Sequence, residues 1–299
     1  MLRSPRSKPE RSRAIVLFYP NPWVFRPESF AGLFAMPAHI HAVVPVKDRA
    51  QAKGRLAGVL DAKERSSLCR AMLEDLLDQL IRARSLAGIS LVACDDETIA
   101  LADRYRVECL VEEKNEGHDA AVAFASNRLA DRGVQGFLQL PGDIPGVRAS
   151  EIDRLIAAHA SAPAFTIAPS HDRRGSNAIV CSPPDLLPLR FGDDSFRAHL
   201  AKARALGIEP MVVESPGIAR DIDTLDDILA FLSTPAFLSN PCDTRTRRFL
   251  VERGFKPSNA LRIPPSNPGS RAASGVEASD GASTATKSVP EPTPSRPRS

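Results

Sequence analysis

Short apolar runs alternate with longer segments of helical periodicity over most of the chain, beginning at residue 40. The run IHAVVPV at 40–46 has the length and the β-branched content of a buried strand. The segment 64–85 then repeats large apolar residues on one helical face, at Leu68, Met72, Leu76 and Leu80. This spacing predicts an amphipathic helix directly after the first strand.

The same alternation continues toward residue 235. Further strands are predicted at 89–96, 107–113, 135–140, 164–170, 177–182 and 209–215. Further helices are predicted at 97–105, 118–133, 149–160, 195–207 and 224–233, the last with Thr224 as its N-cap. Strands separated by helices are typical of an α/β fold, a mostly parallel sheet with helices on both faces. Ligands bind beyond the carboxyl ends of the strands in such sheets.

Both ends of the chain differ in composition from this middle part. Residues 1–35 are basic and interrupted by prolines, and we expect a disordered extension or the product of a start codon placed too far upstream. After Ile263 there is no leucine, isoleucine, methionine or aromatic residue. Such a segment buries too little apolar surface to offset its ordering entropy, so 264–299 is expected to be a disordered tail. The folded domain is therefore expected at 36–263.

Charge and cysteine usage narrow the class of protein. The formal net charge is +3, but residues 36–263 carry 29 basic and 31 acidic residues, which argues against nucleic acid as a partner. No apolar run approaches the roughly 20 residues needed to span a bilayer. The five cysteines form no CxxC pair, so neither a zinc site nor a disulfide framework is indicated, and a cytoplasmic location is expected. The sequence leaves a homodimer open.

One acidic residue stands on a turn that the sequence makes rigid. The stretch LQLPGDIPGV at 138–147 ends a predicted strand and encloses Asp143 between prolines and glycines. Proline fixes φ and glycine tolerates unusual backbone angles, although the same residues also dominate ordinary turns. Because Asp143 follows the carboxyl end of a strand, we interpret it as a functional carboxylate.

A second group of acids comes late in the chain, in ARDIDTLDD. Alternation in an extended segment places Asp221 and Asp223 on the same side. Asp226 and Asp227 fall in the first turn of a predicted helix, where capping explains them. A carboxylate on a rigid turn together with another from a distant strand end is a usual way to hold Mg²⁺ beside phosphates.

Two further groups suit anions. Basic residues follow the first predicted strand without the GxxxxGK[ST] pattern of a P-loop, at Lys47, Arg49, Lys53 and Arg55. They suit a polyphosphate, and a solvated basic loop explains them equally well.

Small polar residues recur at Ser176, Gly192 and Ser195. Ser195 would open a helix whose N–H groups can bind an anion, although an ordinary turn and N-cap also fit.

Taken together, these groups resemble one family. The motifs VPVK…AKGRL, LPGDIP, GSNAI, FGDDSFRAHL and DIDTLDD occur in the same order in the 2-phospho-L-lactate guanylyltransferases, which include phosphoenolpyruvate and 3-phospho-D-glycerate guanylyltransferases of coenzyme F-420 biosynthesis. The resemblance spans about residues 40–235. One departure is Ser176, where the family often has threonine, and the hydroxyl is kept. The resemblance implies a single Rossmann-like nucleotidyltransferase domain of the nucleotide-diphospho-sugar transferase type.

The resemblance also implies a reaction. GMP would pass from GTP to the phosphate of a small three-carbon acid, with Mg²⁺ as cofactor and pyrophosphate as the leaving group. The implied catalytic residues are Lys47, Lys53, Arg55 and Asp143, with Lys47 and Lys53 also binding the nucleotide. The implied metal ligands are Asp143, Asp221 and Asp223. The acceptor phosphate would lie on Ser176, Gly192 and Ser195, and the nucleobase near Asn115 and Gly117.

Three alternatives remain open at this stage. A molybdenum-cofactor-type nucleotidyltransferase shares the fold, and a catalytically silent nucleotide-binding module would keep it without turnover. A GT-A glycosyltransferase would also use a DxD-like motif, but here Asp221 and Asp223 come late in the chain. No single residue decides between 3-phospho-D-glycerate, phosphoenolpyruvate and 2-phospho-L-lactate as the acceptor.

Overall fold

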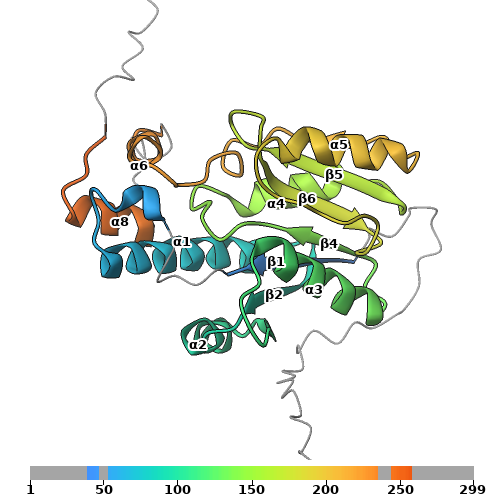
Figure 1. Ribbon diagram of the computed structural model, residues 1–299, viewed down its shortest axis with the longest axis horizontal. Coiled ribbons are helices and arrows are strands. Elements are labelled where there is room, and N and C mark those ends of the chain that lie inside the picture. Colours follow the sequence, from blue (N-terminus) through green and yellow to red (C-terminus); the bar gives the residue numbers. More distant parts are fainter. Residues whose placement is uncertain (1–38, 47–52, 235–243, 258–299) are drawn as a thin grey trace, which may run out of the picture. The chain divides into compact units, whose positions relative to one another are not determined.

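The computed structural model describes residues 39–46, 53–234 and 244–257. Within them, seven strands form one sheet in the order β3-β2-β1-β4-β6-β5-β7 (Figure 1). The strands are β1 Ile40–Pro45, β2 Leu86–Ala93, β3 Glu108–Val111, β4 Gly136–Gln139, β5 Ala164–Pro169, β6 Ser176–Ser182 and β7 Met211–Val212. The predicted terminal segments 1–35 and 264–299 lie outside the described residues.

Helices connect most of these strands and cover both faces of the sheet. They are the short 3₁₀ helix η1 Gly54–Leu56, then α1 Ala62–Arg82, α2 Asp96–Tyr105, α3 His118–Asp131, α4 Ala149–Ala157, α5 Ser195–Ala205, α6 Leu225–Leu232 and α8 Arg245–Glu252. Among the described helices, none is long and apolar enough to cross a membrane.

The sheet is mostly parallel, as predicted, with one exception. β1 pairs in parallel with β2 and β4, β2 with β3, and β5 with β7. β6 is antiparallel to both β4 and β5. Only residues 170–175 join β5 to β6, and a parallel crossover needs a dozen or more residues. The short connection therefore requires a hairpin, and it brings the amino-terminal end of β6 to the edge where the parallel strands have their carboxyl ends.

Successive side chains of the central strands pack into two separate hydrophobic cores, one on each face of the sheet. Val44 and Leu138 pack in one core with residues of α1 and α4. Val43 and Phe137 point to the opposite face and pack with residues of α3 and α5. All four are fully buried. Because both faces are covered, the central strands read as continuous apolar runs and not as an apolar–polar alternation.

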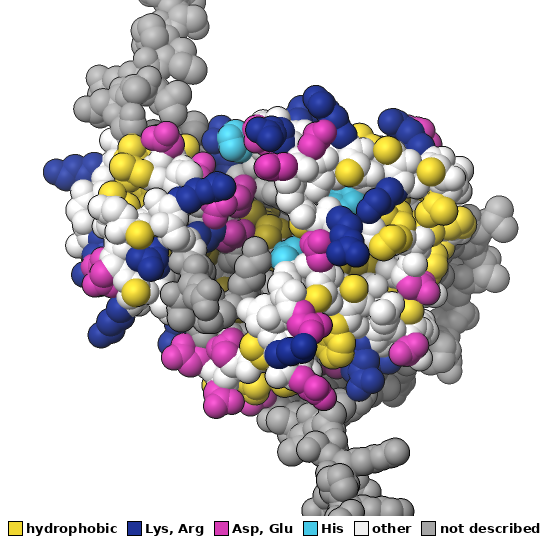
Figure 2. All heavy atoms as spheres, viewed as in Figure 1, with side chains coloured by type: hydrophobic (Ala, Val, Ile, Leu, Met, Phe, Trp, Pro, Cys, Tyr) yellow, Lys and Arg dark blue, Asp and Glu magenta, His cyan; other side chains and the backbone are white. Residues whose placement is uncertain are grey.

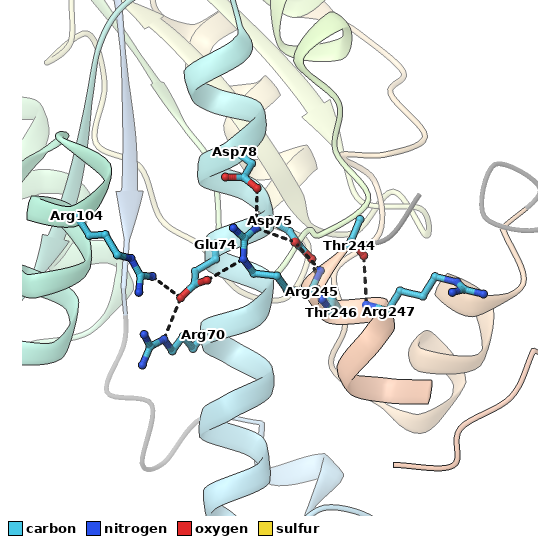
Figure 3. Close-up of polar contacts among 9 residues, drawn as sticks. All are labelled: Arg70, Glu74, Asp75, Asp78, Arg104, Thr244, Arg245, Thr246 and Arg247. Atoms are coloured by element: carbon cyan, nitrogen blue, oxygen red, sulfur yellow. Dashed lines mark hydrogen bonds and ion pairs between the residues drawn. The ribbon is translucent and has the colours of Figure 1, made fainter. Parts of the chain in front are cut away.

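Helix α8 is an element that the sequence analysis did not predict. Its segment is basic, and its apolar residues Phe249, Leu250 and Val251 are consecutive, whereas the buried face is formed by Thr246 and Leu250 at helical spacing. The helix is held by acidic residues of α1 (Figure 3). The Asp75 carboxylate accepts the backbone N–H groups of Arg245 and Thr246, both at 2.9 Å. These tertiary contacts add to the local N-cap, in which the Thr244 hydroxyl accepts the backbone N–H of Arg247.

The side chain of Arg245 reinforces the same junction. It lies 2.9 Å from Glu74 and 2.6 Å from Asp78 of α1, and Arg104 of α2 also contacts Glu74. Below these ion pairs, Leu250 is buried in a third apolar cluster with Leu56, Leu68 and Ile222, together with other residues of α6 and α8.

We expect Asp75→Ala to lower the free energy of unfolding by about 2 kcal/mol, because two backbone N–H groups of α8 lose their acceptor. The melting temperature should fall by roughly 4–8 °C in a domain of this size. Asp131→Ala is the matched control, since its carboxylate is exposed at the end of α3. Equal melting temperatures for both variants would contradict the anchoring role of Asp75.

Candidate active site

A cavity of about 910 Å³ opens at the edge of the sheet where the parallel strands have their carboxyl ends. Its walls include Val46 after β1, the turn 141–143 after β4, and Ser176 and Asn177 at the start of β6. Figure 2 shows one hollowed face of the molecule, with acidic side chains and histidines around the hollow. The site therefore lies where an α/β sheet is expected to bind its ligands.

Three carboxylates meet in this cavity. Asp143, Asp221 and Asp223 each contribute an oxygen, and these oxygens lie within 4.8 Å of one another. Between the last two, Ile222 is buried in the third apolar cluster, and its backbone N–H donates to the carbonyl of Asp143 at 3.1 Å. The predicted alternation is therefore observed, with both acids facing the cavity and Ile222 facing the core.

The neighbouring acids have the structural roles expected from the sequence. The Asp227 carboxylate accepts the backbone N–H and the hydroxyl of Thr224, which is the N-cap of α6. Asp226 is exposed in the first turn of the same helix. Capping thus accounts for Asp227, and the position of Asp226 at the start of a helix suits its charge. The catalytic candidates remain the three carboxylates above.

Lys53 lies at the centre of the carboxylates. Its ammonium group is 2.6 Å from Asp143 and 2.6 Å from Asp223, and its side chain is only 6% exposed. Burial lowers the pKa of Lys53, but the two carboxylates outweigh burial and raise that pKa above its ordinary value. Lys53 has φ of 57°, in the left-handed region that a lysine rarely adopts. This unusual backbone conformation places a positively charged ammonium group beside the two carboxylates.

Asp221 is held differently. Burial raises the pKa of its carboxyl, and the negative charge of Asp143 raises it further. The amide of Asn177 donates to Asp221 at 3.3 Å and to the carbonyl of Ile218 at 3.0 Å. Asn177 thus fixes the orientation of this carboxylate. The sequence analysis assigned no role to Asn177, although the GSN motif contains it.

The structure describes only part of the basic segment that the sequence analysis assigned to the site. Lys47 lies outside the described residues. Arg55 lines the cavity with a side chain that is 76% exposed and lies 3.9 Å from Asp223.

Asn115 and Gly117, which were predicted near the nucleobase, do not line this cavity, and their role in base recognition stays a prediction. The Asn115 side chain instead accepts the backbone N–H of Gly117 at 3.0 Å, which shapes the turn into α3. The next two residues, His118 and Asp119, do line the cavity. The segment that follows the predicted pair therefore reaches the cavity, at the start of α3.

The predicted acceptor residues do come together. Ser176, Gly192 and Ser195 line one wall, and the two serine hydroxyl oxygens are 3.3 Å apart. Gly192 has φ of 136°, which favours glycine. The expectation of free N–H groups at the start of α5 needs correction, because the N–H of Ser195 donates to Gly192 and that of Phe196 to Arg174. The side-chain hydroxyls of Ser176 and Ser195 are therefore among the donors that this wall offers.

Such a fold, with carboxylates and a lysine beyond the strand ends, defines the class of α/β nucleotidyltransferases. The fold is similar to that of a protein from Desulfovibrio desulfuricans G20 assigned as a nucleotide-diphospho-sugar transferase. The TM-score is 0.59 at 17% identity, covering 73% of this chain and 96% of that one. Residues 40–259 match the family described as guanylyl transferase CofC like, and the chain belongs to that family.

Curated relatives agree with this assignment. A phosphoenolpyruvate guanylyltransferase of Roseiflexus sp. (strain RS-1) is 32% identical over 226 residues, which cover 76% of this chain and 99% of the relative. One of Rubrobacter xylanophilus is 32% identical, covering 63% and 91%. A 3-phospho-D-glycerate guanylyltransferase of Colwellia psychrerythraea is 31% identical, covering 64% and 92%. The predicted fold and the predicted enzyme class are therefore confirmed.

Proposed function

We propose that the enzyme transfers GMP from GTP to the phosphate of a phosphorylated three-carbon acid and releases pyrophosphate. The acid is phosphoenolpyruvate, 3-phospho-D-glycerate or 2-phospho-L-lactate, and the reaction serves coenzyme F-420 biosynthesis in the cytoplasm. The relatives named above support the first two acids. The observation that carries the proposal is one cavity lined both by a charged carboxylate–lysine group and by two buried serine hydroxyls.

The donor set fits Mg²⁺. Asp143, Asp221 and Asp223 offer hard oxygen ligands within 4.8 Å of one another, the type of donor that Mg²⁺ prefers beside phosphates. When bound, the ion supplies charge stabilisation for phosphoryl oxygens. Lys53 adds a positive charge beside the same carboxylates, suited to the triphosphate and to the departing pyrophosphate.

The acceptor needs no general base. A phosphate monoester has a second pKa of about 6, so its oxygens are largely deprotonated at neutral pH. One of these oxygens attacks the α-phosphorus of GTP. The bond from the α-phosphorus to the bridging oxygen breaks, and the electron pair leaves with pyrophosphate. The task of the protein is to hold two polyanions in line while it neutralises their charge.

Ser195→Ala should raise the KM for the acceptor by about 10- to 150-fold, because a hydrogen bond to a charged group is worth about 1.5–3 kcal/mol. The dissociation constant of GTP should barely change, because the side chain of Ser195 contacts Ser176, whereas Lys53 contacts Asp143 and Asp223. Ser67→Ala is the control, on the exposed face of α1. If Ser195→Ala weakens GTP binding and leaves the acceptor KM unchanged, the serine belongs to the nucleotide site.

The function itself is tested by incubating the purified protein with GTP, Mg²⁺ and each of the three acids in turn. We expect pyrophosphate release that depends on one of these acids and on GTP. Parallel incubations with ATP and CTP test the choice of base. GTP binding without pyrophosphate release for any acid would favour a catalytically silent module.

A further inference from the structure

His199 is a buried histidine behind the acceptor wall. It lies on α5 one turn after Ser195, and it is completely buried. Its ring packs against Phe191 and Phe165, with centroid distances of 5.4 Å and 6.4 Å. His199 does not line the cavity, whereas Ser176 and Ser195 do. It can therefore influence a ligand only through the groups that it contacts.

The contacts of His199 determine which ring nitrogen carries the proton. The backbone N–H of Arg190 points at Nε2 from 3.1 Å. A backbone N–H can only donate, so Nε2 must be the unprotonated nitrogen. The hydrogen of the neutral ring is then on Nδ1, which lies 3.0 Å from the hydroxyl oxygen of Ser176. Burial lowers the pKa of His199 to about 4, which keeps the ring neutral at physiological pH.

The loop that donates to His199 is itself held in place. The backbone N–H of Phe191, the next residue after Arg190, donates to the Asp119 carboxylate at 2.9 Å. Asp119 stands in the first turn of α3. The donor to Nε2 is thus fixed from a second element, and the tautomer of His199 does not depend on α5 alone.

The tautomer dictates what Ser176 can do. A hydroxyl has one hydrogen to donate and two lone pairs to accept with. If Ser176 accepts from Nδ1, its own hydrogen is directed elsewhere, and the available directions are Ser195 at 3.3 Å and the cavity. With the opposite tautomer, Ser176 would donate its hydrogen to the histidine and turn its lone pairs toward an incoming anion. These lone pairs would repel the anion.

From this chain of contacts we infer that His199 is a positioning residue for the acceptor site. In its Nδ1–H form it makes the Ser176 hydroxyl a hydrogen-bond donor to a phosphorylated or carboxylated anion. The inference rests on the proposed function for the identity of that anion. It extends the proposal by assigning acceptor affinity to a residue that never touches the acceptor.

Two substitutions test the roles of the two ring nitrogens of His199 independently. In His199→Asn the side-chain amide stands near the position of Nδ1 and can still donate to Ser176. In His199→Gln the amide reaches the position of Nε2, so it keeps a partner for Arg190 and loses the donor to Ser176. We expect His199→Gln to raise the acceptor KM about 10-fold, the equivalent of one charged hydrogen bond, with kcat and GTP affinity within about twofold. His199→Asn should restore most of the affinity.

The matched control is His159→Gln. His159 is another histidine bonded to two hydroxyls, of Thr166 and Ser182, and it does not line the cavity. This variant should change thermal stability without changing the acceptor KM. In a Ser176→Ala background, His199→Gln should have no further effect on the acceptor KM, because its route to the ligand is gone. Equal acceptor KM values for His199→Gln and His199→Asn, or additive effects with Ser176→Ala, would overturn the inference.

A direct measurement keeps the inference testable if a variant does not fold. Nitrogen and carbon chemical shifts of the His199 ring in the full-length wild-type protein report which nitrogen is protonated. The Nδ1–H form supports the inference, and the Nε2–H form overturns it. This result does not depend on turnover. A protein with the Nδ1–H form but no guanylyl transfer would therefore refute the proposed function and leave the positioning of Ser176 intact.

Discussion

Asp143→Asn is expected to reduce kcat for guanylyl transfer by at least about 100-fold, equivalent to roughly 2.7 kcal/mol of transition-state stabilisation. The change removes a negative charge from the three-carboxylate group and one of the two close partners of Lys53. The amide has nearly the same shape as the carboxylate, so the loss should come from charge and not from packing. Single-turnover rates with saturating GTP and acceptor measure this effect.

Asp226→Asn is the control for this variant. Asp226 is an exposed acid of the same late segment, in the first turn of α6 and outside the cavity wall. Its turnover should stay close to that of the wild type. Near-normal turnover of Asp143→Asn, with Mg²⁺ still required, would contradict the assignment of Asp143 to the metal.

Lys53→Met is expected to reduce kcat/KM for GTP by about 100-fold or more, a loss typical of removing one preorganised group that stabilises transition-state charge. The ammonium group is the close positive partner of both Asp143 and Asp223. Methionine keeps most of the buried chain length and removes only the charge. Steady-state kinetics with varied GTP, together with GTP binding by calorimetry, measure the effect.

Lys63→Met supplies the comparison, because Lys63 is exposed in the first turn of α1. It removes the same charge from the protein without touching the site. If Lys53→Met and Lys63→Met have the same kcat/KM for GTP, the charge of Lys53 does not contribute to turnover, and its catalytic role is refuted.

Local patterns were sufficient to predict most of the fold. The helical spacing of Leu68 and Leu76 is preserved in α1, and the alternation around Ile222 placed Asp221 and Asp223 on one side. Such patterns depend on residues a few positions apart. They also placed Asp143 at the correct edge of the sheet, because the carboxyl ends of parallel strands meet there.

The features that sequence reasoning missed depend on contacts between distant segments. The sequence predicted Lys53 as a site residue, but it did not predict the contacts of Lys53 with Asp143 and Asp223, which are 90 and 170 residues away in the chain. Helix α8 forms where Asp75, 170 residues earlier, accepts the N–H of Arg245. Local spacing predicts neither long-range contact, and the only local signal for α8 at its start is the N-cap Thr244.

The histidine behind the acceptor wall illustrates a further limit. The motif FGDDSFRAHL contains His199, and its spacing of four from Ser195 places both on one face of a helix. The spacing cannot predict that the backbone N–H of Arg190 donates to the ring or that Nδ1 of His199 is hydrogen-bonded to the Ser176 hydroxyl. Those contacts follow from the loop between β6 and α5 and from the hairpin that carries β6.

The central claim is that a phosphate oxygen of a three-carbon acid attacks the α-phosphorus of GTP in this cavity. Mass spectrometry of a reaction with isotopically labelled acceptor phosphate tests it most directly. The acceptor that supports pyrophosphate release in the unlabelled assay is supplied with heavy oxygen on its phosphate and mixed with GTP and Mg²⁺. The account predicts a GMP–acid diphosphate that retains every labelled oxygen, and unlabelled pyrophosphate. Labelled pyrophosphate, or GMP and pyrophosphate formed without any joined product, would contradict it.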